Sequence, residues 1–125
     1  MRDGGRDVSR ASPYGGAMEF ETSTFVFLMR AYPQPSLSDE DRERIQQEHL
    51  DYLTRLTDEG PIIVAGPFGD QTDENLRGLC VMAVPMEEAL ALMSQDPSVR
   101  AGVFRCESAT WYRFPGRATF RSTPE

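Results

Sequence analysis

Two segments of the chain are apolar at nearly every position, and they restrict the fold more than any other feature. Residues 23–32, STFVFLMRAY, are rich in β-branched and aromatic side chains, and residues 77–84, RGLCVMAV, repeat the pattern. A half-buried strand alternates apolar and polar residues, so continuous runs of this length indicate strands covered on both faces. The sheet that contains them therefore needs protein on each side.

A helix is predicted between the first run and the next strand. Ser38 and Asp41 form a variant capping box, and the acidic residues around them suit the positive end of a helix dipole. The pattern continues to about Glu59 and stops at Gly60-Pro61. This segment is the longest helix that the sequence predicts.

The remaining patterns add two strands and a second helix. Residues 62–65 and 103–114 have strand composition, and helical spacing of apolar residues begins after Pro85, which supplies a rigid start but no side-chain cap. Asp96-Pro97 ends this helix, because the residue before a proline is pushed out of the α conformation.

The order of elements is β-α-β-β-α-β, which predicts an α+β, ferredoxin-like sandwich. Such a fold has an antiparallel four-stranded sheet with two helices on one face, and its first and third strands lie in the middle. Those are the two runs that are apolar on both faces, yet the helices cover only one face. We therefore expect a homodimer in which two copies pack sheet to sheet.

The expected domain is a single one, residues 22–114, between two polar segments. Residues 1–21 and 115–125 carry too little apolar surface to offset the entropy of ordering them, so we expect flexible tails there. The 125-residue chain is too short for two ordinary domains.

The net charge and the cysteine content restrict the partners and the cellular setting that the protein can have. The chain has a formal net charge of −7, which argues against nucleic acid or an anionic membrane as a partner. No apolar run approaches the roughly 20 residues of a membrane helix, and no secretory signal is recognisable. Cys80 and Cys106 fall on strands that the first strand separates, so they are expected to be free thiols in a cytoplasmic protein.

His49 is the one histidine, and it lies on the apolar stripe of the first helix, four residues after Ile45. A histidine in such a position is more often a hydrogen-bonded core residue than a functional one. The functional alternative is a general base, which needs a carboxylate at its other ring nitrogen. Asp96 is the candidate, because both helices pack on the same face of the sheet. From the local sequence alone, however, the pair Asp96-Pro97 is also typical of an ordinary helix end, with no functional role for Asp96.

Other residues are weaker candidates for ligand binding. The turn Gly66-Pro67-Phe68 could let the backbone approach a ligand, although a tight strand exit explains it equally well. Arg30 interrupts an apolar strand as an anion-binding group or as half of an ion pair. No cluster of metal-ligand residues and no phosphate-binding loop is present, so neither metal nor organic cofactor is expected.

The chain resembles the YciI-like (YCII-related) family of dimeric α/β-barrel proteins over residues 25 to about 113. The matching stretches are RERIQQEHLDYLTRL, IIVAGPF and EEALALMSQDPSVRAGVF. The resemblance implies a ferredoxin-like fold, a dimer, and a dyad of His49 and Asp96 as the active centre. One group of proteins in this family eliminates HCl from a chlorinated aromatic diol. The wider superfamily includes muconolactone isomerases and cofactor-free monooxygenases.

These observations favour a cofactor-free lyase or isomerase that acts on a small cyclic or aromatic molecule. His49 would move a proton and Asp96 would orient it, while Arg30 and the turn Gly66-Pro67-Phe68 would bind substrate. A noncatalytic ligand-binding dimer, in which His49 is structural, is the first rival. A cofactor-free monooxygenase of the same barrel type is the second.

Overall fold

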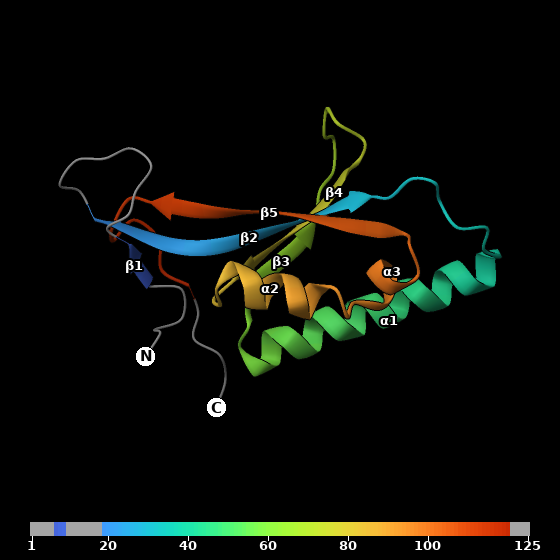
Figure 1. Cartoon of the computed structure of the whole chain (residues 1–125), viewed down its shortest axis with the longest axis horizontal. Coiled ribbons are helices and arrows are strands. Elements are labelled where there is room, and N and C mark those ends of the chain that lie inside the picture. The colour runs from blue at the N-terminus through green and yellow to red at the C-terminus, as the bar shows by residue number, and fades with distance from the viewer. Residues whose placement is uncertain (1–6, 10–18, 121–125) are drawn as a thin grey trace.

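The protein is an antiparallel sheet covered by helices on one face. The computed structural model describes residues 7–9 and 19–120. Four strands lie in the order β5–β2–β4–β3, and every neighbouring pair is antiparallel; their bounds are β2 (Phe20–Arg30), β3 (Ile62–Pro67), β4 (Leu76–Met82) and β5 (Phe104–Arg113). The helices α1 (Asp39–Glu59), α2 (Met86–Met93) and α3 (Pro97–Arg100) lie together on one side of the sheet (Figure 1). The predicted α+β ferredoxin-like fold is confirmed, with the two apolar runs in the middle strands β2 and β4.

A short additional strand, β1 (Asp7–Ser9), extends this sheet. It pairs antiparallel with residues 20–22 of β2, beyond the point where β4 ends. The sequence pattern did not predict β1, and β2 begins two residues before the expected domain start at residue 22. Much of the remaining N-terminal segment and residues 121–125 lie outside the described residues, so the flexibility of both tails stays a prediction.

The helix ends follow local sequence closely. The Ser38 side chain accepts a hydrogen bond from the backbone N–H of Asp41, and α1 ends at Gly60, whose φ of 112° suits a residue without Cβ. At the start of α2, Pro85 makes no side-chain cap, as predicted. The helix α2 ends at Met93, before the predicted stop at Asp96-Pro97, and an additional helical turn that the sequence did not predict, α3, begins there with Asp96 as its N-cap.

The core lies between the helices and one face of the sheet. Val26 and Leu28 of β2 pack there with residues of β4 and with Leu56 of α1. Because side chains alternate along a strand, Phe25 and Phe27 point to the other face. The core therefore uses only half of the apolar residues on the two middle strands.

The second face of the sheet carries no helix among the described residues. We call it the open face, and its apolar members are Phe25, Phe27, Val64, Leu79, Val81, Ala109 and Trp111. The rings of Phe25 and Trp111 lie 4.9 Å apart, and Val64 is 47% exposed and Trp111 38% exposed. The same face carries the exposed ion pair of Arg105 and Glu107, so its apolar side chains form an accessible patch with a charged border. In the described part of the chain, no helix is long and apolar enough to cross a bilayer.

Candidate active site

The site is built around His49, which α1 holds near its middle. The buried side of α1 is formed by Ile45, His49 and Leu56, so the predicted stripe does place the imidazole against the protein interior. His49 is 5% exposed, and its ring meets Phe104 of β5 edge-on at 5.7 Å between centroids. The contact with Phe104 restricts the orientation of the imidazole ring.

The carboxylate of Asp96, directly before α3, contacts the imidazole of His49. Its Oδ2 atom lies 2.7 Å from Nδ1 of His49, while its Oδ1 atom accepts a hydrogen bond of 3.0 Å from the backbone N–H of Ser98. Asp96 is fully buried. The residue thus serves as the N-cap of α3 and as the partner of His49 at once, so the structural and functional interpretations of Asp96 are compatible.

Ser98 is the third member of this cluster, and the sequence analysis did not identify it. Its Oγ atom lies 3.2 Å from Nδ1 of His49, and the residue is 1% exposed. Within the described residues, both hydrogen bonds of the imidazole are made through Nδ1. Nε2 is therefore the ring nitrogen that remains for a ligand.

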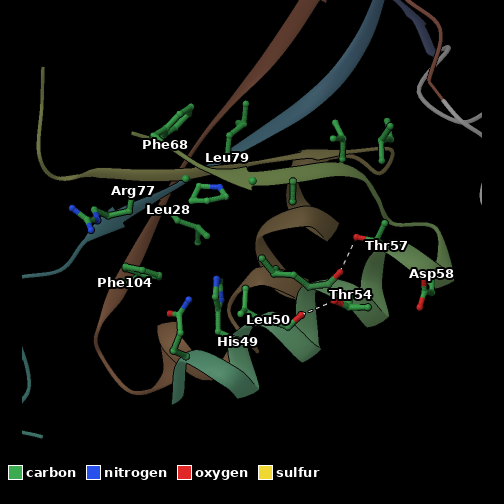
Figure 2. A pocket seen from close by; sticks show the side chains of 18 residues that line it. Leu28, His49, Leu50, Thr54, Thr57, Asp58, Phe68, Arg77, Leu79 and Phe104 are labelled. Atoms are coloured by element: carbon green, nitrogen blue, oxygen red, sulfur yellow. Dashed lines mark hydrogen bonds between the residues drawn. The ribbon is translucent and has the colours of Figure 1, made fainter. Parts of the chain in front are cut away.

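A cavity of about 570 Å³ opens beside the imidazole, between α1 and strands β3 and β4. Figure 2 shows His49 pointing from α1 toward the sheet, with Leu28 and Phe104 close to it. Apolar side chains from the helix and from the sheet form most of the wall, among them Leu28, Leu50, Leu53 and Phe104. A volume of this size suits a small organic ligand.

The predicted glycine-proline segment reaches the cavity, with one correction to its structure. Gly66, Pro67 and Phe68 all line the cavity. Gly66 and Pro67, however, belong to β3 and do not form a turn after it. Proline is tolerated there because β3 is an edge strand, whose outward N–H groups need no partner in the sheet.

Arg30 does not join these residues. It lies exposed at the end of β2, its guanidinium group is 5.6 Å from the ring centroid of Tyr32, and it is not among the residues that line the cavity. The arginine in the lining is Arg77 of β4, and Gln46 of α1 adds an amide. The sequence signals for Arg77 and Gln46 were weak, because both are ordinary polar residues on exposed positions.

The polar and aromatic residues of β5 after Phe104 are also separate from the cavity. Arg105 forms an ion pair with Glu107, and the buried Arg113 lies 3.7 Å from Glu21. Trp111 and Tyr112 do not line the cavity either. The contribution of β5 to the cavity wall is Phe104, at the start of the strand.

The two cysteines lie behind the site as protonated thiols. Burial, with a smaller contribution from the charge of Asp96, raises the pKa of Cys80 to about 12 and that of Cys106 to about 11. Both cysteines are free. Among the described residues, no group of three or more histidine, cysteine or acidic side chains could hold a metal ion.

The fold and this cluster together define a class: ferredoxin-like α+β proteins with a buried histidine–aspartate pair beside a cavity. The YCII-related domain family matches residues 24–108, which is more than half of the chain. The chain therefore belongs to the YCII-related family, and the resemblance seen in its sequence is confirmed.

A solved structure extends this comparison. The chain is similar to 5-chloro-2-hydroxyhydroquinone dehydrochlorinase from Burkholderia phenoliruptrix AC1100, solved in complex with 2,5-dihydroxybenzoquinone. The sequence identity is 25% and the TM-score 0.50, and the match covers 70% of this chain and 92% of that one. A comparison with curated proteins finds no match.

Proposed function

We propose that the protein is a cofactor-independent lyase or isomerase in which His49 transfers a proton of a small cyclic or aromatic substrate. The observation that carries this proposal is the 2.7 Å contact between Nδ1 of His49 and Asp96, made by an imidazole that also lines a cavity. The similarity to a dehydrochlorinase of the same fold supports the reaction class.

The reaction follows from the hydrogen bonds of the ring. With Nδ1–H held by the carboxylate of Asp96, Nε2 presents a lone pair toward the cavity. It removes a proton from a carbon next to a carbonyl group, the electron pair forms a C=C bond, and a leaving group on the adjacent carbon departs with its bonding electrons. In an isomerisation, the imidazolium instead returns the proton to another carbon. Asp96 stabilises the imidazolium in both cases.

The cavity also indicates how a substrate is bound. Its apolar walls suit a ring, and the guanidinium of Arg77 supplies a positive charge for an ionised hydroxyl or a carboxylate. We assign to Arg77 the role that the sequence analysis gave to Arg30. We retain Gly66 and Pro67 of β3, with Phe68 directly after the strand, as substrate-binding residues. Without a lysine in the chain, no Schiff base with a lysine side chain can form.

The test is turnover of chlorinated and hydroxylated hydroquinones, followed by chloride release and by quinone absorbance. The variant His49→Gln removes the base but keeps a side chain that can reach Asp96, so we expect a loss of roughly 10²- to 10⁴-fold in kcat. Glu48→Gln, next to His49 on the exposed side of α1, is the matched control and should keep full activity. Equal activity of His49→Gln and the native protein would refute the proposal.

The rival function is ligand binding without turnover, and the deep burial of His49 is the observation that favours it. Under this alternative, calorimetry detects hydroquinone binding but no chloride is released by any substrate of the panel. An oxygen electrode in the same assay separates the monooxygenase alternative, which consumes oxygen, from elimination, which does not.

We further propose that two copies pack through their open faces. The helices leave this face uncovered, and its centre carries apolar and aromatic side chains beside the exposed ion pair of Arg105 and Glu107. The free thiols Cys80 and Cys106 support a reducing, cytoplasmic setting for this dimer.

A further inference from the structure

Two oxygen atoms approach the same nitrogen of His49. Asp96 Oδ2 is 2.7 Å and Ser98 Oγ is 3.2 Å from Nδ1. A ring nitrogen carries at most one hydrogen, so these two contacts cannot both be ordinary donations from it. Either Nδ1–H is shared between two acceptors, or the serine hydroxyl donates to a bare Nδ1.

The fixed charge of Asp96 decides between these arrangements. A bare Nδ1 would direct its lone pair at a carboxylate oxygen 2.7 Å away, which is repulsive while the carboxylate is ionised. Nδ1 therefore keeps its hydrogen, and Ser98 Oγ accepts the weaker, longer branch of a shared bond. The negative end of the hydroxyl dipole then faces the imidazole.

The backbone and the side chain of Ser98 have separate tasks. The backbone N–H donates to Asp96 Oδ1 and would do so for any residue at this position. The hydroxyl contacts Nδ1 of His49. At 1% exposure, water cannot readily replace it. The hydroxyl is thus directed at the ring and is not needed to start α3.

We propose that Ser98 is a positioning residue that completes a Ser98–His49–Asp96 triad and strengthens His49 as a base. The inference rests on the proposed function of His49. An acceptor at Nδ1–H interacts more strongly with the imidazolium than with the neutral ring, because the N–H of the imidazolium is more positive. The second acceptor also limits rotation of the ring, so that Nε2 stays directed into the cavity.

The experiment compares Ser98→Ala with Ser98→Thr and with Ser94→Ala. Ser94 is the matched control, because its hydroxyl donates to the backbone carbonyl of Ala91 at the end of α2. NMR follows the His49 ring through a pH titration, and steady-state kinetics on a chlorinated hydroquinone give kcat and KM. Ser98→Cys, with nearly the same volume and a poor acceptor, repeats the test should Ser98→Ala fail to fold.

We expect Ser98→Ala to move the titration of His49 to lower pH by roughly half a unit and to lower kcat about threefold, with little change in KM. Ser98→Thr should restore both values, and Ser94→Ala should change neither. A titration of His49 that ignores Ser98→Ala and Ser98→Cys would overturn the proposal. Because the NMR measurement needs no substrate, it decides the role of Ser98 even if no lyase activity is found.

Discussion

At the scale of single residues, the site depends on a charge that water cannot reach. Asp96 is fully buried, and its carboxylate is satisfied by one backbone N–H and by His49. Removing one partner of a buried pair leaves the other without compensation, which is far more costly than losing an exposed ion pair. The pair therefore contributes to the fold as well as to the proposed chemistry.

The sequence identified His49 and Asp96 but not the residues around them. A histidine on an apolar stripe and an Asp-Pro helix end are visible as patterns, and the fold class brings them together. Ser98 was missed because a serine after Asp-Pro has no distinctive spacing. Arg30 was chosen in place of Arg77 because a strand pattern does not reveal which arginine faces a cavity.

The buried thiols predict how stability changes in alkaline solution. In the folded protein the pKa of Cys80 is raised to about 12 and that of Cys106 to about 11, from an ordinary value of 9.0. Above pH 9 the unfolded chain therefore loses protons that the folded chain retains, so the free energy of unfolding falls as pH rises. The stabilisation is fully present below pH 9, and Cys80 alone accounts for a loss of roughly 1 kcal/mol at pH 10.

Urea denaturation between pH 8 and 10 measures this effect. The double variant Cys80→Ala/Cys106→Ala is less stable at pH 8, because it leaves small voids, but its stability should fall less steeply toward pH 10. Parallel curves for the two proteins would contradict the assignment of the alkaline loss to the thiols.

At the scale of helices and strands, the long elements were predictable and the short ones were not. The cap at Ser38, the stop at Gly60 and the four longer strands follow from local sequence. By contrast, β1 exists through its pairing with β2, and α3 through the cap of Asp96 and the contacts around His49. Three- and four-residue elements gain too little from their own sequence, so tertiary contacts decide them.

The close approach of β3 and β4 beside the cavity gives a prediction at this scale. A Cβ atom at Gly78 would lie 3.1 Å from the carbonyl oxygen of Gly66, which the strand pairing holds in place. Gly78→Ala should therefore destabilise the protein by roughly 1 kcal/mol, because backbone must move. In Gly69→Ala, where the added Cβ meets nothing within 4 Å, thermal denaturation should show no such loss. Equal melting temperatures of the two variants would contradict this account of the strand contact.

At the scale of the whole molecule, the two faces of the sheet are unequal. One is sealed by the helices over a core that includes Val26, Met82 and Met93, while the open face carries aromatic side chains of similar size without a covering layer. The sequence already indicated this difference between the faces. The strands β2 and β4 are apolar on both faces, and the helices can cover only one face of the sheet. The sequence could not show that the lining of the cavity continues to Leu79 and Phe68, which project from the sheet on the side away from His49 (Figure 2).

The oligomeric state tests whether a second copy covers the open face. In light scattering coupled to gel filtration, the native chain should have twice its monomer mass of 14.1 kDa. Trp111→Lys places a charge on the open face and should shift the protein toward the monomer at micromolar concentration, because a charge buried in the interface would have no partner. Leu90→Lys is the matched control, since Leu90 is 36% exposed against 38% for Trp111 but lies on α2, and it should leave the dimer intact. A native protein of monomer mass, or dissociation by Leu90→Lys and not by Trp111→Lys, would exclude packing through this face.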